Sequence, residues 1–285
     1  MSRSYWQIGS VVSCFIANFF AGGLPNSYGV MYTYMKEPLG TTEWELSWIG
    51  SLMGGCIGFA SILGTVCVDC LGCRLSTLFG GVLVGIGYII GSQMDSLYIL
   101  YLTLGVLPGT GVCIAFTASM VHVSKQFSKW RPLAVGASVS GIAVGMLVWP
   151  PLSSAVADNM GWRGTFLING ALTLHFIPGA LLITPANNTG PSNDTTLSLR
   201  QAVGSCLQMF KISGAIHISF VYIFLGFSYY TFSSSLPDYL TSTLSTLTSS
   251  DAALILSTSG YGGMVSRIVS TGISMEAGRE FIHLC

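Results

Sequence analysis

Residues 127–157 read FSKWRPLAVGASVSGIAVGMLVWPPLSSAVA and join a basic cluster to a long apolar run. Lys129 and Arg131 supply the charge, and no charged residue occurs between positions 133 and 157. A bilayer core about 30 Å thick is crossed by roughly 20 apolar residues of helix. The stretch therefore predicts a transmembrane helix whose basic end is held at one membrane surface.

The composition of the whole chain agrees with this interpretation. Only 8% of the 285 residues are charged, 51% are hydrophobic, and the mean hydropathy is +0.66. A soluble domain carries about a quarter charged residues, so this chain lacks the polar groups to cover its surface in water. The net charge of zero offers no basic face to nucleic acid. We expect an all-α membrane protein with lipid, and no nucleic acid, as its partner.

Apolar runs long enough to cross a bilayer occur eight times between the few charges. They cover approximately residues 7–34, 46–68, 75–93, 97–123, 133–157, 164–184, 214–237 and 252–274. A segment rich in Pro, Gly, Asn, Ser and Thr follows the sixth run and is typical of a linker. We predict an N-terminal six-helix half at 1–184, a cytoplasmic linker at 185–212, two further helices at 213–274 and an atypical tail at 275–285.

The basic residues also predict the orientation of the chain, because short cytoplasmic loops retain Lys and Arg. With the N-terminus inside, the outer segments hold only Lys36 and Arg163. The inner segments hold Arg3, Arg74, Lys125, Lys129, Arg131, Arg200 and Lys211. We therefore expect both ends of the chain in the cytoplasm.

Small residues and prolines indicate how the helices pack. Glycines four residues apart share one helix face and allow helices to approach closely in lipid. Pro25 and Pro108 each remove a backbone hydrogen bond, which predicts a kink in the first and the fourth span. The glycine pairs are Gly54/Gly58, Gly81/Gly85, Gly87/Gly91, Gly105/Gly109 and Gly141/Gly145.

Two short motifs resemble those of a known superfamily of carriers. The segment 69–74, DCLGCR, places Asp69 and Arg74 around Gly72, which can reverse the chain while the charges pair with each other or with helix ends. This segment resembles the loop between the second and third helices of the major facilitator superfamily. Cys67, Cys70 and Cys73 lack a fourth ligand nearby, so we expect no metal and no other cofactor.

The stretch that begins at residue 127 is similar to the start of the fifth helix in the monocarboxylate transporter family. An aromatic residue, a basic cluster with Lys129 and Arg131, Leu-Ala and then spaced glycines from Gly136 carry the likeness. Residues 161–166, GWRGTF, with Trp162 and Arg163, also resemble the family's pattern, although an interfacial tryptophan and a charge anchor explain the same residue types. The family implies a bundle of two six-helix halves with the substrate between them. This chain would supply one half and two further helices, as a C-terminally truncated member.

Arg267 is the strongest candidate for a functional residue. Counted from Ala252 at about 1.5 Å per residue, it lies about 22 Å into a core about 30 Å thick. An arginine inside the membrane is costly and is a functional candidate by default, and its fork can bind a carboxylate. The alternative is that its side chain extends to the cytoplasmic surface.

The resemblance adds a role for Arg267 and a second site residue. Residues 261–267, YGGMVSR, look like the family's eighth-helix segment, in which the arginine binds the substrate carboxylate. In proton-coupled members an aspartate precedes that arginine by four residues, and a first-helix lysine follows a proline. Gly263 and Asn26 occupy these positions here. Neither side chain titrates, which favours facilitated transport or an amino-acid-like substrate over the proton symport of the family.

The functional prediction is alternating-access transport of small monocarboxylates or related organic anions, with Arg267 and Asn26 at the substrate. The family also implies a plasma-membrane location and a possible single-span accessory subunit. The alternative is a non-transporting truncated form that modulates, or cannot replace, a full-length relative. We expect no enzymatic activity, because the sequence offers no Cys/His dyad, paired carboxylates or metal cluster.

Overall fold

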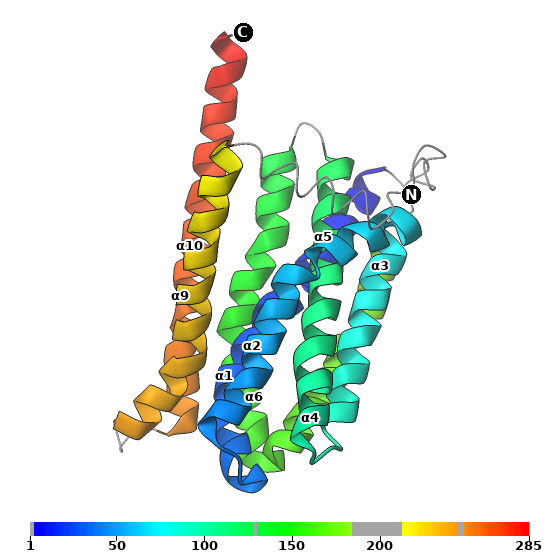
Figure 1. Ribbon diagram of the computed structural model, residues 1–285. Helices are drawn as coiled ribbons and strands as arrows, with labels where there is room; N and C mark the ends of the chain where they lie inside the picture. Colours follow the sequence, from blue (N-terminus) through cyan, green and yellow to red (C-terminus); the bar gives the residue numbers. More distant parts are fainter. Residues whose placement is uncertain (1–2, 128–129, 184–212, 244–247, 285) are drawn as a thin grey trace.

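The computed structural model describes residues 3–127, 130–183, 213–243 and 248–284. Every regular element in these ranges is a helix, so the predicted all-α class is confirmed (Figure 1). Lys129, Arg200, Lys211 and the predicted linker at 185–212 lie outside the described residues.

The helices follow one another with short connections. In chain order they are α1 (Arg3–Leu39), α2 (Glu43–Phe59), α3 (Ser61–Gly91), α4 (Leu97–Leu100), the π-helix η1 (Tyr101–Val106), α5 (Leu107–Gln126), α6 (Arg131–Thr173), α7 (Phe176–Leu182), α9 (Ser213–Thr243) and α10 (Ser249–Leu284).

Two glycines reverse the chain inside stretches that are otherwise continuous helix. Gly72 in α3 has φ 80° and ψ 165°, and Gly161 in α6 has φ 70° and ψ 179°. A positive φ is accessible to glycine at little cost, so these positions form tight turns without a loop. Each glycine therefore separates two antiparallel membrane crossings, as the gaps between the predicted spans require.

Length and composition identify four candidate membrane-spanning stretches in the described residues. They are Gln7–Leu39, Ser61–Gly91, Leu97–Gln126 and Arg131–Leu182. The last has 52 residues, far more than the roughly 20 needed for one crossing, and it contains the reversal at Gly161. The two chain ends lie at the same end of the bundle (Figure 1). The protein is thus an integral, multi-pass membrane protein.

The helix ends differ from the predicted spans where no sequence signal stops the helix. The predicted end of the last span at residue 274 lies inside α10, which continues to Leu284. Residues 275–284 contain no proline and are mostly ordinary helix formers, so the helix propagates beyond the apolar run. The second predicted span is divided between α2 and the start of α3, with a slight break at Ala60.

The prolines affect the backbone in different ways. Helix α1 continues through Pro25. Pro108 has no N–H to donate to the carbonyl of Leu104, and the helix changes to a π-helical register directly before it. In this register the N–H of Leu107 donates to the carbonyl of Leu102, five residues back. The lost hydrogen bond at Pro108 is thus accompanied by a local change of hydrogen-bond register.

Glycine contacts hold α6 against α1. A Cβ atom on Gly141 would overlap the carbonyl oxygen of Phe15, and one on Gly145 would lie 2.9 Å from the backbone nitrogen of Gly23. On α1, a Cβ atom on Gly22 would lie 2.7 Å from the Cα of Ile142. The Gly141/Gly145 pair is thus a packing face, as predicted. Gly58 is an exception, because a Cβ atom there would meet nothing within 4 Å.

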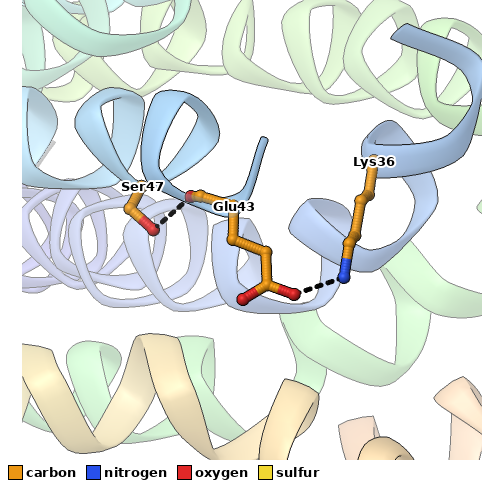
Figure 2. Close-up of polar contacts among 3 residues, drawn as sticks. All are labelled: Lys36, Glu43 and Ser47. Carbon is orange, nitrogen blue, oxygen red and sulfur yellow. Dashed lines mark hydrogen bonds and ion pairs between the residues drawn. The ribbon is translucent and has the colours of Figure 1, made fainter. Parts of the chain in front are cut away.

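An ion pair closes the corner between α1 and α2 (Figure 2). The Nζ atom of Lys36, in the last turn of α1, lies 2.5 Å from a carboxylate oxygen of Glu43, the first residue of α2. The hydroxyl of Ser47 donates to the backbone carbonyl of Glu43 at 2.8 Å. Both charged side chains are substantially exposed, so the pair orients the corner more than it stabilises it.

Thr42 and Glu45 form a capping box at the start of α2. The backbone N–H of Thr42 donates to Glu45 at 2.9 Å, and the N–H of Glu45 donates to the hydroxyl of Thr42 at 3.4 Å. The hydrogen bonds from the backbone and hydroxyl of Thr42 lower the pKa of Glu45 from its usual 4.5. Thr248 and Asp251 repeat the arrangement at the start of α10, and the hydroxyl of Thr248 lowers the pKa of Asp251.

We predict that acid weakens this cap. Folding lowers the pKa of Glu45, so the Glu45 carboxylate stabilises the folded protein fully above about pH 4.5. This stabilisation is lost as the pH falls through the pKa that Glu45 has in the folded protein. Thermal unfolding in detergent should therefore show less stabilisation from Glu45 at pH 3 than at pH 6. Thr42→Ala should cost about 1 kcal/mol at pH 6, a typical value for an N-cap. Glu45→Gln is the control, and a pH dependence identical to the wild type would contradict the assignment.

Candidate functional site

Arg267 lies on α10 with its guanidinium directed back along the helix. The Nη1 atom would lie 3.3 Å from a Cβ atom on Gly263, four residues nearer the N-terminus of α10, and Nη1 is itself buried. Helical side chains lean toward the N-terminus of their helix, which explains the direction. Since α10 runs toward the end of the bundle that holds both chain ends, the guanidinium points away from that end (Figure 1). Extension toward the end that holds both chain ends, which the basic residues predict to be cytoplasmic, would require the opposite direction.

The guanidinium lies where α10 meets α6, the helix against which α10 mainly packs. A Cβ atom on Gly260 would lie 2.8 Å from both the carbonyl oxygen of Ala143 and the backbone nitrogen of Leu147. One on Gly263 would lie 3.7 Å from the Cβ of Ala143. We call this contact, formed by Gly260 and Gly263 of α10 with Ala143 and Leu147 of α6, the α6–α10 seam. Glycine on α10 is what permits the close approach.

Asn26 lies on α1, one helical turn after Gly22. Its side chain is buried, and its amide donates to the backbone carbonyl of Gly22 at 2.7 Å. Gly22 in turn packs against Ile142, the neighbour of Ala143. The structure therefore places Asn26 and Arg267 on two helices that both contact the Ile142–Ala143 turn.

Asp69, Arg74 and Arg131 lie about one membrane crossing away from Asp95 and Asp158, at the other ends of α3 and of the first part of α6. Gly72 forms the chain reversal described above, and Asp69 and Arg74 flank it. In the part of the chain that the structure describes, Asp69 and Arg74 do not form the ion pair that their spacing allows. Arg131 begins α6 and is exposed. The glycine that follows in the motif, Gly136, is half-buried in the second turn of α6.

Trp162 and Arg163 follow the reversal at Gly161. Trp162 is only 5% exposed and packs edge-on against Phe166, so it is a core residue and not part of an interfacial belt. The guanidinium carbon of Arg163 lies 5.0 Å from the centre of the Trp162 ring, and Arg163 forms an ion pair with Asp95. The ion pair ties α6 to the connection between α3 and α4, and the cation–π contact holds the Arg163 side chain over its neighbour in α6.

Sequence reasoning missed several partners at this end of the bundle. The hydroxyl of Tyr34 donates to Asp158 at 2.7 Å and is 3.0 Å from the hydroxyl of Ser154, which joins α1 to α6. Tyr34 and Asp158 are 124 positions apart, so their spacing carries no local signal. No group of side chains that could hold a metal ion occurs within residues 3–127, 130–183, 213–243 and 248–284.

Comparison with known proteins identifies the family. Residues 14–283 match the model of the Major Facilitator Superfamily. Monocarboxylate transporter 6 of Mus musculus is 32% identical over 218 residues, which are 75% of this chain and 47% of that protein. Monocarboxylate transporter 3 of Mus musculus is 34% identical over 163 residues, which are 57% of this chain and 33% of that protein. The chain spans about half or less of the length of these curated relatives.

Solved structures show a similar fold. A mutant of the peptide transporter POT in complex with alafosfalin superimposes with a TM-score of 0.55 at 16% identity, covering 78% of this chain and 50% of that chain. The same transporter in complex with sulfate gives a TM-score of 0.53 at 18% identity, over 76% of this chain and 46% of that chain. At these identities the likeness concerns the fold alone. With the family match over residues 14–283 and the named relatives, the predicted recognition is confirmed: the chain belongs to the major facilitator superfamily, where it is similar to the monocarboxylate transporters.

Proposed function

We propose that the protein carries small monocarboxylates or related organic anions across a membrane by alternating access, with Arg267 binding the carboxylate. The observation that supports this most is the direction of the Arg267 side chain, toward Gly263 and into the α6–α10 seam. A guanidinium held within the bundle presents two parallel N–H donors to a carboxylate, in surroundings of low dielectric constant. The transporter names of the curated relatives agree with this role.

Asn26 is the second substrate residue of the proposal. Its buried amide, which donates to the carbonyl of Gly22 on α1, supports this role, because a polar side chain is held there within the bundle. A neutral amide offers one donor pair and one acceptor and does not titrate. With Gly263 where a carboxylate would otherwise precede Arg267, we propose facilitated transport without proton coupling at these two positions.

The proposal extends to the setting of the protein. The charge asymmetry favours a cytoplasmic N-terminus, with residues 1–184 as one structural half and 213–274 as two helices of another. The resemblance to monocarboxylate transporters favours the plasma membrane, a possible single-span accessory subunit, and transport instead of enzymatic catalysis.

Reconstitution tests the proposed function. The purified 285-residue chain in liposomes should take up radiolabelled pyruvate with saturable kinetics, and excess unlabelled pyruvate should compete. Empty liposomes measure the leak. No uptake above this leak would contradict transport by this chain. If the chain instead alters pyruvate flux through a co-reconstituted monocarboxylate transporter 6, it acts as a modulator.

A further inference from the structure

Two pairs of aromatic side chains lie at the starts of α2 and α4, at the end of the bundle away from both chain ends (Figure 1). Trp44 and Trp48 are one turn apart on α2, and their rings meet edge to face with centres 5.8 Å apart. Tyr98 and Tyr101, in α4 and η1, have ring centres 6.2 Å apart. The hydroxyl of Tyr101 donates to the backbone carbonyl of Glu45 at 3.0 Å, which joins the two pairs. We call the four aromatic residues the aromatic patch.

The patch exposes most of its ring surface. Trp44 is 72% exposed, Trp48 45% and Tyr98 83%. Within residues 3–127, 130–183, 213–243 and 248–284, no group accepts a hydrogen bond from either indole N–H or from the hydroxyl of Tyr98. Such amphipathic rings suit surroundings that are apolar on one side and accept hydrogen bonds on the other. The headgroup region of a bilayer offers both.

The neighbouring charges place the patch at the depth of the headgroups. Glu43, which pairs with Lys36, directly precedes the tryptophan pair in the chain. Asp95, which pairs with Arg163, closely precedes the tyrosine pair. All four charged side chains are exposed, so water lies on this side of the patch. On the other side, the predicted apolar runs begin at positions 46 and 97.

We propose that the aromatic patch binds the headgroup region of the phospholipid bilayer and fixes the depth at which α2 and α4 begin. The indole N–H and phenol O–H groups donate to ester and phosphate oxygens of the lipid, while the rings contact the first acyl carbons. A protein seated on the patch would also take water from the charge of Glu43 beside Trp44, which is costly. Lipid headgroups leave that charge hydrated. The interfacial role that residue type alone suggested for Trp162 thus belongs to residues of α2 and α4.

Quenching of tryptophan fluorescence by brominated lipid tests this inference. The full chain is reconstituted in phosphatidylcholine that carries bromine either near the headgroup end or near the methyl end of its acyl chains. The emission of the patch is the difference between the wild type and the double variant Trp44→Phe, Trp48→Phe. We expect bromine near the headgroup end to quench this emission at least about twofold more strongly, because interfacial rings lie at that depth.

Trp162→Phe is the matched control, because Trp162 lies at the same end of the bundle but is only 5% exposed. The emission that this substitution removes should be quenched only weakly by either lipid. Stronger quenching of the patch by bromine near the methyl end would place it in the hydrocarbon core and overturn the inference.

An absence of quenching by both lipids would also overturn it. Iodide in the buffer then distinguishes a patch exposed to water, which iodide quenches, from a patch covered by another protein, which it does not. If the double variant does not fold, the same comparison with Trp44→Phe alone decides. The measurement requires no substrate, so its outcome is independent of the proposed transport.

Discussion

Uptake of monocarboxylates should fall about 100-fold in Arg267→Ala. The loss of a charge-assisted, two-pronged contact with a carboxylate corresponds to about 3 kcal/mol, and each 1.4 kcal/mol is a factor of ten. Arg267→Lys keeps the positive charge but removes the planar fork, so it should retain an intermediate activity with a raised KM. Initial uptake rates in liposomes, at several substrate concentrations, measure both effects.

A stability measurement separates binding from folding in this experiment. A guanidinium inside a membrane is costly, so Arg267→Ala should unfold at the same or a higher temperature than the wild type. Arg279→Ala is the control, because it removes the same charge from α10 beyond the predicted span. Wild-type uptake in Arg267→Ala would remove this residue from the site, as would an equal loss in Arg279→Ala.

The largest expected effect on stability is that of Gly145→Val. The first added carbon would overlap the carbonyl oxygen of Phe19, and it would lie 2.9 Å from the nitrogen of Gly23. Both atoms belong to the backbone of α1, so the two helices have to separate. We expect a loss of about 3 kcal/mol, at the upper end of what overpacking costs. Thermal unfolding in detergent and the fraction of monodisperse protein on size exclusion measure this loss.

Gly58→Val provides the comparison for this substitution. Gly58 is also a glycine within a helix, α2, but a Cβ atom on it would meet nothing within 4 Å. Its replacement should change the unfolding temperature only slightly. Equal unfolding temperatures for Gly58→Val and Gly145→Val would show that the contact with α1 does not depend on glycine.

Local signals in the sequence predicted the helical architecture well. Apolar runs of membrane length and the charges between them gave the order of the crossings, and the chain reverses at Gly72 between two of the predicted spans. Gly141 and Gly145 were predicted to lie on a packing face because their spacing alone puts them on one side of a helix. Helix α10 extends past the predicted span to Leu284, because the end of an apolar run is not itself a signal that ends a helix.

The candidate site around Arg267 was predictable from the sequence only in part. Arg267 is conspicuous because a charge is rare within an apolar run, and its direction follows from the tilt of helical side chains. Ala143 has no such signal, because alanines are common in every span. Its contact with α10 arises only from the crossing of α6 with α10. The burial of Trp162 and the pairing of Arg163 with Asp95 likewise depend on tertiary packing between segments distant in sequence.

The contacts at the far end of the bundle differ in kind from those of the seam. Lys36 with Glu43, Arg163 with Asp95 and Tyr34 with Asp158 are polar links within residues 34–163. The seam is described by close van der Waals contacts of Gly260 and Gly263 with Ala143. Concentrated salt should therefore weaken the three polar links while α10 stays packed against α6. Short-chain detergents and lipids that alter lateral pressure should act on α10 first, so the choice of amphiphile decides whether the purified protein keeps Arg267 against α6.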